Sequence, residues 1–410
     1  MSTISDFDEK YDIIDDFTPR HELMTGRYKK SFAYFTLRER LPVILTGVID
    51  NLTKDKDELA DQYGEGCREE IKTVIGQLSK LKYELQTDKQ LHSFSGNEFN
   101  AYAEPDKEIW NNFLLSLHTN RSFFKTCWLY AECYMYRKIC SFFEATKTLN
   151  EYDYFTKPKQ NALTGCMESV ESVAQNTRNS NPDLSTFTQF VKLNLWGNRC
   201  DLSISVGKEI KQAADQYQLI SLFDKNLLIN QTRLIWDCII TAKSKPVIID
   251  YVCDNAGYEL FTDFILADFL VEHKLVDKVR FNVKAWPWFV SDVTPTDFDW
   301  TLDYLANQNS NVLKYLGRKW QLLLQEGKFE LAPVNYFWTS PYEFYRMRDH
   351  DPELYKRLSA ARLIIFKGDL NYRKLLGDYT WDTDADFLTC LRGMAFNLPI
   401  CAPYAQLKRI

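Results

Sequence analysis

The sequence lacks most of the short motifs that identify a reaction class. Its ten cysteines include no Cys-x-x-Cys pair and its five histidines show no zinc-ligand spacing, so we expect reduced, buried thiols and no nitrogen and sulfur metal centre. The absence of a Gly-x-x-x-x-Gly-Lys-Ser/Thr loop disfavours P-loop nucleotide chemistry, and the absence of a Gly-x-Ser-x-Gly motif disfavours ordinary serine hydrolysis. No glycine-rich dinucleotide fingerprint opens a strand-to-helix turn in the C-terminal half. Because no nitrogen and sulfur metal centre is expected, any metal should be bound through oxygen.

Long apolar runs and an excess of basic charge are also missing. No run approaches the roughly 18 apolar residues of a membrane span, and the N-terminal MSTISDFDEKYDIIDDF is acidic where a secretory signal needs a basic start. The formal net charge of -6 gives no reason to expect nucleic acid as the main ligand. We expect a monomeric intracellular protein in the cytoplasm, with the nucleus as an additional compartment, and neither nucleic acid nor membrane as a partner.

The chain has 410 residues, more than the roughly 250 to 300 at which a single hydrophobic core stops growing. Its N-terminal and C-terminal parts show different patterns of apolar residues. From about residue 36 to 180, apolar residues recur at helical spacing in LRERLPVILTGVIDNL, EEIKTVIGQLSKLKYELQ and WLYAECYMYRKICSFFEA, with polar breaks at DKDELADQYGEG and TRNSNPDLST. The second break is the preferred boundary between the helical N-terminal part and the rest of the chain. We expect a loose tail over 1–30, a helical domain over 31–185 and a catalytic domain over 186–410.

The C-terminal half has the pattern of a parallel sheet covered by helices. PVIIDYVCDN, VRFNVKAWPWFVSD and RLIIFKGDLN are short runs rich in Val, Ile and Phe, and helical segments such as ELFTDFILADFLVEH lie between them. The sequence therefore predicts an α/β fold, with a helix-covered parallel sheet in the C-terminal half and a helical N-terminal domain before it.

Polar side chains follow each of the three predicted strands. Asp254 and Asn255 follow the first, Ser291 and Asp292 the second, and KGDLNYRKLLGD begins at the end of the third. Because ligands bind beyond the carboxyl ends of parallel strands, these groups should converge. Two carboxylates and an amide oxygen form the kind of site that Mg²⁺ or Mn²⁺ accepts, and a divalent ion there supports phosphoester hydrolysis.

Each of these residues also has a structural interpretation. Asp254 or Asn255 alone would most often be a helix N-cap, and a lone Asp292 after a strand is often a turn former. Glu259 and Asp263 would by default lie on a solvated face or complement the helix dipole. Like charges one turn apart repel, however, so a nearby cation is the better explanation for the pair. The segment KGDLNYRKLLGD resembles an anion-binding turn, with a basic helix start as the alternative.

Four long segments together resemble one family. LNLWGNRCDLS, DNAGYELFTDFILADFL, WPWFVSDVTPTDFDW and IIFKGDLNYRKLLGD occur in the order found in damage-control phosphatases, in the eukaryotic subfamily also described as protein-glutamate (acidic residue) O-methyltransferases. The resemblance extends from SFAYFTLRERLPVILTGVID to LPIC, which is most of the chain. It implies a helical N-terminal part, a Rossmann-like α/β/α domain and hydrolysis of sugar phosphates such as fructose 1-phosphate and fructose 6-phosphate.

The resemblance also implies roles for particular residues. A divalent metal, Mn²⁺, Co²⁺, Ni²⁺ or Mg²⁺, would be held by catalytic Asp254, Asn255 and Asp292, and Glu259 would contact S-adenosyl-L-methionine in the methyltransferase interpretation, whose substrate is a protein carboxylate. Asn198 and Asp201 match a further motif near the site. The expected substrate contacts are Asp369, Leu370, Asn371, Tyr372, Arg373 and Lys408.

The C-terminal segment departs from the family pattern. An Arg-Thr-x-Lys motif, whose lysine binds the substrate phosphate, is expected after the cysteine that matches Cys401, whereas this chain reads CAPYAQLKRI. Aligned through its lysine, Lys408 survives and Ala405 and Gln406 replace Arg and Thr; aligned through Cys401, the lysine is lost. The expectations are thus a metal-dependent phosphatase, a methyltransferase, or a weakened or non-catalytic form that kept the fold.

Overall fold

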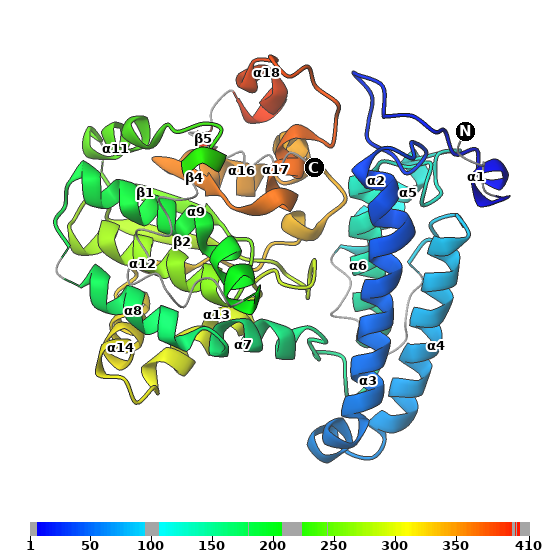
Figure 1. Ribbon diagram of the computed structural model, residues 1–410, viewed down its shortest axis with the longest axis horizontal. Coiled ribbons are helices and arrows are strands. Elements are labelled where there is room, and N and C mark those ends of the chain that lie inside the picture. The colour runs from blue at the N-terminus through cyan, green and yellow to red at the C-terminus, as the bar shows by residue number, and fades with distance from the viewer. Residues whose placement is uncertain are drawn as a thin grey trace.

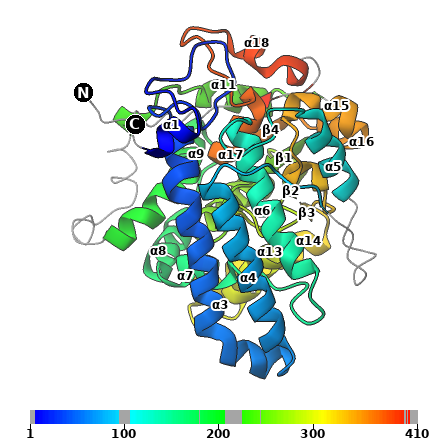
Figure 2. The same cartoon turned by 90° about the vertical axis from the view of Figure 1, so that its right-hand side faces the viewer.

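The computed structural model describes residues 6–94, 106–178, 180–206, 224–243, 245–395, 398 and 400–401, and for residues 6, 198–206, 225, 400 and 401 it describes the backbone alone. Helices α3, α4 and α6 lie side by side on one side of the molecule, and a sheet with its own helices lies on the other (Figure 1). The view turned by 90° places these helices in front of the sheet (Figure 2).

The N-terminal part is helical, as its apolar spacing predicts. The elements are α1 (Asp6–Lys10), α2 (Phe32–Phe35), the π-helical turn η1 (Thr36–Arg40), α3 (Leu41–Tyr63), α4 (Cys67–Gln86), α5 (Lys107–Ser116) and α6 (Trp128–Glu144). The stripe Leu41, Leu45, Val48 and Leu52 of α3 is buried against α4. Helix α6 is buried on nearly every side, because it lies between these helices and the C-terminal part.

The polar segment 55–66 is a helix over most of its length, which corrects the break expected there. Helix α3 continues to Tyr63, since Leu59 and Ala60 extend its buried stripe despite the charged residues between them. The chain turns only at Gly64, whose φ of +91° is a conformation that glycine adopts without strain. Residues 64–66 form the short turn between α3 and α4.

The segment before residue 31 makes defined contacts with distant parts of the chain. Leu23 forms an antiparallel bridge with Tyr379, and the Met24 amide donates to the Asp378 carbonyl at 2.8 Å. Lys29 Nζ lies 2.5 Å from Asp8 Oδ2. The contacts of Leu23 and Met24 connect the N-terminal segment to the turn that follows α17, and the ion pair of Lys29 with Asp8 lies within the segment.

The C-terminal part alternates strands and helices. Its strands are β1 (Ile248–Val252), β2 (Lys278–Asn282), β3 (Phe329–Leu331), β4 (Leu363–Phe366) and β5 (Ile400–Cys401). Its α-helices are α7 (Thr156–Thr164), α8 (Met167–Thr177), α9 (Leu184–Val206), α11 (Thr232–Ile240), α12 (Tyr258–Glu272), α13 (Pro295–Ala306), α14 (Asn311–Gln325), α15 (Met347–His350), α16 (Pro352–Ser359), α17 (Gly368–Leu376) and α18 (Phe387–Leu391). The 3₁₀ turns are η3 (Asp224–Asn226), η4 (Tyr336–Thr339), η5 (Phe344–Arg346) and η6 (Arg392–Met394).

The five strands form one parallel sheet in the order β3-β2-β1-β4-β5. Its side chains alternate between two hydrophobic clusters. Ile249 and Tyr251 of β1 pack with α8, α9, α12, α13 and α14, whereas Val252 and Ile364 pack with the cluster that contains the N-terminal helices. The predicted α/β fold with a helical N-terminal part is confirmed, and so are the three predicted strands.

Helix α9 begins at Leu184, next to the domain boundary expected after residue 185, which stays a prediction. Helices α7 and α8, which precede it, contribute Leu163, Val170 and Val173 to the same hydrophobic cluster as the sheet. The eight cysteines whose side chains the structure describes are free and mostly buried, as predicted. In the same ranges, no helix has the length and apolar character needed to cross a membrane.

Candidate functional site

The ends of β1 and of the loop after β2 are joined by the backbone. Asn255 forms an isolated antiparallel bridge with Asp292. The Ala256 amide donates to the Ser291 carbonyl at 2.8 Å, and the Val293 amide donates to the Asp254 carbonyl at 2.8 Å. The three predicted metal ligands are therefore brought together at one edge of the sheet, as the parallel arrangement requires.

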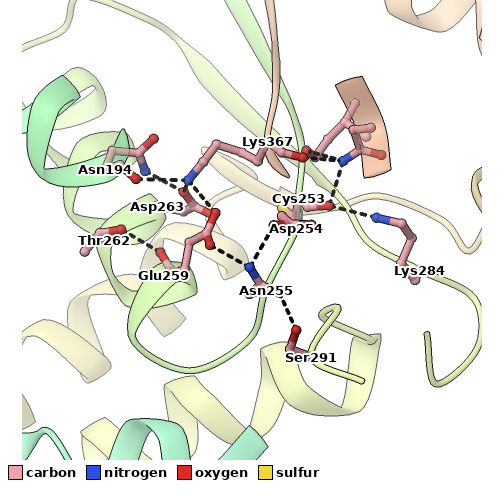
Figure 3. A network of polar contacts seen from close by, with 12 residues as sticks. Asn194, Cys253, Asp254, Asn255, Glu259, Thr262, Asp263, Lys284, Ser291 and Lys367 are labelled. Atoms are coloured by element: carbon pink, nitrogen blue, oxygen red, sulfur yellow. Dashed lines mark hydrogen bonds and ion pairs between the residues drawn. The ribbon is translucent and has the colours of Figure 1, made fainter. Parts of the chain in front are cut away.

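The side chain of Asn255 is fixed at both ends (Figure 3). Its Nδ2 donates to Asp254 Oδ2 at 2.7 Å and to Glu259 Oε2 at 2.8 Å. Its Oδ1 accepts a hydrogen bond of 2.5 Å from Ser291 Oγ. Because both amide hydrogens face carboxylates, the amide oxygen has to face the opposite way, where it keeps a second lone pair.

Asp292 is held by a buried lysine that sequence reasoning missed. Lys284 Nζ lies 3.0 Å from Asp292 Oδ2 and donates to the Cys253 carbonyl at 2.9 Å. Lys284 is 1% exposed, so this cation belongs to the interior of the site. The available signal is its position in FNVKAW, where a lysine interrupts an apolar run directly after a strand.

The carboxylates raise one another's pKa values. Burial, followed by the charges of Glu259 and Asp292, raises the pKa of Asp254 well above its usual range. Burial raises the pKa of Asp292 to about 6, although Lys284 opposes the shift, and Asp369 adds a further negative charge near both groups. A site that concentrates negative charge away from water favours a bound cation.

Neither Asp254 nor Asn255 caps a helix, so that interpretation is wrong for both. Helix α12 has Gly257 at its N-cap, with no hydrogen bond from a capping side chain. Asp254 and Asn255 instead direct their side chains toward the contacts described above.

Helix α17 begins directly against Asp254. Gly368, its first residue, has a φ of +80°, and a Cβ at this position would lie closer than 3.0 Å to the Asp254 carboxylate. Its N-cap, Lys367, makes no side-chain capping hydrogen bond, so no described side chain occupies the first amides of α17. Gly368 and Asp369 are exposed. An exposed helix N-terminus beside a buried carboxylate set is suited to bind a phosphate group.

The other predicted substrate contacts on α17 lie in the interior. Asn371 is 0% exposed, and its Nδ2 donates to the carbonyls of Val252 at 3.2 Å, Cys253 at 3.2 Å and Lys367 at 2.7 Å. This amide therefore joins the ends of β1 and β4. Leu370 is buried in the cluster of the N-terminal helices, and Tyr372 is half-buried.

Arg373 contacts the N-terminal helices and the turn after α17. Its Nε and Nη2 donate to Asp378 at 2.9 and 2.8 Å, and its Nη1 donates to Glu132 of α6 at 2.7 Å. The guanidinium also lies 3.6 Å from the centre of the Trp128 ring. The described contacts of Arg373 thus attach α17 to α6, and they do not bring its guanidinium to the Asp254 carboxylate.

Glu259 and Asp263 are bridged by a lysine, which confirms the prediction of a nearby cation. Lys367 Nζ lies 3.0 Å from Glu259 Oε1 and 2.7 Å from Asp263 Oδ1 (Figure 3). The expectation of a solvated face is wrong for both residues, because they are 4% and 0% exposed. Lys367 stood at a predicted strand end, but its partners could not be predicted because they lie on a different helix.

Three residues of interest fall outside this description. Lys408 lies beyond the described residues, and the side chains of Asn198 and Asp201 are not described although their backbone belongs to α9. Within the described ranges, no three His, Cys, Asp or Glu side chains are grouped so that they could hold a metal ion. A metal at Asp254 and Asp292 therefore depends on the amide oxygen of Asn255 and on water, a donor set that suits hard divalent cations.

Comparison with known proteins agrees with the resemblance noted from the motifs. Residues 36–402 match the family model described as the damage-control phosphatase ARMT1-like domain. The damage-control phosphatase ARMT1 of Danio rerio is 35% identical over 399 residues, which cover 92% of this chain and 88% of that protein. The proteins of the same name from Xenopus tropicalis and Homo sapiens are 36% and 34% identical, each over 92% of this chain and 89% of their own length. The chain belongs to the damage-control phosphatase ARMT1-like family.

Proposed function

We propose that this protein is a metal-dependent phosphatase that hydrolyses sugar phosphates such as fructose 1-phosphate and fructose 6-phosphate in metabolite damage control. One observation carries the proposal. The buried carboxylates of Asp254 and Asp292 adjoin the exposed N-terminus of α17, so groups suited to bind a cation and groups suited to bind an anion lie side by side. The names of the relatives support the reaction class.

The residues present fit a divalent cation. Asp254 and Asp292 offer carboxylate oxygens, and Asn255 offers an amide oxygen whose orientation is fixed by its Nδ2 contacts. Mn²⁺, Co²⁺, Ni²⁺ and Mg²⁺ are the candidates. When bound, such an ion polarises a phosphoryl oxygen and lowers the pKa of a bound water.

The protein's own groups position the substrate. The first amides of α17 bind the phosphate, and Gly368 permits close approach because it has no side chain. Asp369, exposed at the start of α17, accepts hydrogen bonds from sugar hydroxyls. Asn371 and Arg373 act indirectly in this proposal: Asn371 joins the strand ends, and Arg373 attaches α17 to α6.

The test is release of inorganic phosphate from fructose 1-phosphate with added Mn²⁺ or Co²⁺. We expect Asp254→Ala to lose activity, whereas Asp268→Asn, which changes a carboxylate of α12 that pairs with Lys319, should retain it. Equal, slow release by the wild type and Asp254→Ala would refute the proposal.

No described contact favours the methyltransferase alternative. Both oxygens of Glu259 are engaged, Oε1 by Lys367 at 3.0 Å and Oε2 by Asn255 at 2.8 Å. Calorimetry with S-adenosyl-L-methionine tests the alternative directly. Micromolar affinity for S-adenosyl-L-methionine that disappears in Glu259→Ala would favour the methyltransferase function over the phosphatase function.

A further inference from the structure

Helix α12 carries two pairs of carboxylates, and each pair is bridged by one lysine from another helix or its N-cap. Lys367 bridges Glu259 and Asp263, which lie one turn apart. Further along α12, Lys319 of α14 bridges Asp268 and Glu272, which also lie one turn apart, with a distance of 2.7 Å to each carboxylate. The two bridges have the same chemistry but different surroundings, because only the first adjoins the strand ends.

Lys367 connects three elements. It is the N-cap residue of α17, its Nζ contacts two carboxylates of α12, and it donates to the Asn194 carbonyl of α9 at 3.3 Å. Asn194 Nδ2 also donates to Asp263 Oδ1. Lys367 is 7% exposed, so its charge is compensated within the protein. Burial lowers the pKa of Lys367, but Asp263 and Glu259 raise it overall, and the lysine therefore stays charged.

The contacts of Lys367 continue to the proposed metal ligands through Glu259. With Oε1 held by Lys367, Glu259 directs Oε2 to Asn255 Nδ2 at 2.8 Å. Nδ2 donates its second hydrogen bond to Asp254 Oδ2. A rotation of the Asn255 amide by 180° would place its oxygen against two carboxylates, so Glu259 and Asp254 together select one of two amide orientations.

We propose that Lys367 is a positioning residue for the metal site, which it serves by holding Glu259 in the orientation that fixes the Asn255 amide oxygen. The inference rests on the proposed function, since it concerns how the ligands of that site are held. Groups that orient metal ligands typically contribute about 10- to 100-fold in metal affinity.

The direction in which Mn²⁺ affinity changes when Lys367 is replaced distinguishes a positioning role from a purely electrostatic one. Removal of a cation from the neighbourhood of Asp254 and Asp292 makes the site more negative, and charge alone would then tighten the binding of Mn²⁺. Loss of positioning weakens binding instead, because the Asn255 oxygen is no longer held toward the ion. A Lys367→Met variant therefore gives opposite results under the two explanations.

The experiment is isothermal titration of the metal-free protein with MnCl₂. We expect Lys367→Met to raise the Kd for Mn²⁺ at least tenfold, whereas the matched control Lys319→Met, which removes the second bridge of α12, leaves the Kd within about twofold of the wild type. An unchanged or lower Kd in Lys367→Met would overturn the inference. Failure of the wild type to bind Mn²⁺ would instead overturn the proposed function.

A second pair of variants covers the case in which Lys367→Met does not fold. Asp263→Asn keeps the ion pair between Lys367 and Glu259, and Asp263→Asn with Lys367→Met removes it while keeping the net charge of the wild type. We expect Asp263→Asn to bind Mn²⁺ with nearly the wild-type Kd and the double variant to bind at least tenfold more weakly. Equal Kd values for the two would refute a positioning role for Lys367.

Discussion

Substitution of Gly368 by alanine tests whether the backbone of α17 lies directly against Asp254. Gly368 has a φ of +80°, and a Cβ there would lie closer than 3.0 Å to the carboxylate of Asp254. Gly327 is the matched control, because its φ is +69° and a Cβ would meet nothing within 4 Å. The two substitutions share the backbone strain and differ in the steric conflict.

The expected magnitudes follow from these two terms. The left-handed backbone costs an alanine roughly 1 to 2 kcal/mol, so Gly327→Ala should lower the free energy of unfolding by that amount. Gly368→Ala should lower it by about 1.5 to 3 kcal/mol more, because Asp254 has to move and its charged hydrogen bond with Asn255 is lost. Displacement of a proposed ligand should also raise the Kd for Mn²⁺ at least tenfold in Gly368→Ala alone.

Urea unfolding measures the first effect, and calorimetry with MnCl₂ measures the second. If Gly368→Ala and Gly327→Ala lose the same stability and bind Mn²⁺ equally well, Asp254 does not lie against Gly368 and the geometry of the proposed site is wrong.

Three further predictions concern groups outside the proposed ligand set. Arg373→Leu should lower the free energy of unfolding by about 3 to 5 kcal/mol, since it leaves two buried carboxylates without a cation; unchanged stability with a raised KM would instead favour direct substrate contact. Burial lowers the pKa of Lys374 to about 8, below its unfolded value of about 10.4. Between these two pH values the unfolded chain binds more protons than the folded protein does. The free energy of unfolding should therefore rise with pH in this range, by at most about 1.4 kcal/mol per pH unit. In urea titrations from pH 7 to 10, Lys374→Met should lack this component, and an identical pH dependence would contradict it. Gly317→Ala should destabilise the protein by about 1 to 3 kcal/mol, because the added Cβ would overlap the neighbouring helix α13. Gly76→Ala, in open space on α4, should stabilise it by about 0.5 to 1 kcal/mol. A lower urea midpoint for Gly76→Ala than for Gly317→Ala would contradict this packing.

Long apolar patterns predicted the main elements correctly, and short or charged ones did not. The runs that become β1, β2 and β4 are buried and rich in branched residues, so their strand character is visible in the sequence. Strands β3 (Phe329–Leu331) and β5 (Ile400–Cys401) were missed because three and two residues cannot show an alternation. The charged end of α3 was read as a break, since its buried stripe there consists only of Leu59 and Ala60.

The convergence of Asp254, Asn255 and Asp292 could be predicted because parallel strands end at one edge of a sheet. The partners of Arg373 could not, because Glu132 is 241 residues away along the chain and nothing in the motif indicates it. A basic residue after a strand is equally consistent with a phosphate contact and with a buried ion pair, and only the three-dimensional packing distinguishes the two.

The measurement that tests the central claim most directly is an anomalous diffraction map of a crystal grown with Mn²⁺. The proposed site predicts one peak within about 2.0 to 2.4 Å of a carboxylate oxygen of Asp254, a carboxylate oxygen of Asp292 and Oδ1 of Asn255. The claim is contradicted if no peak forms there, or if the ion is bound elsewhere without these three oxygens.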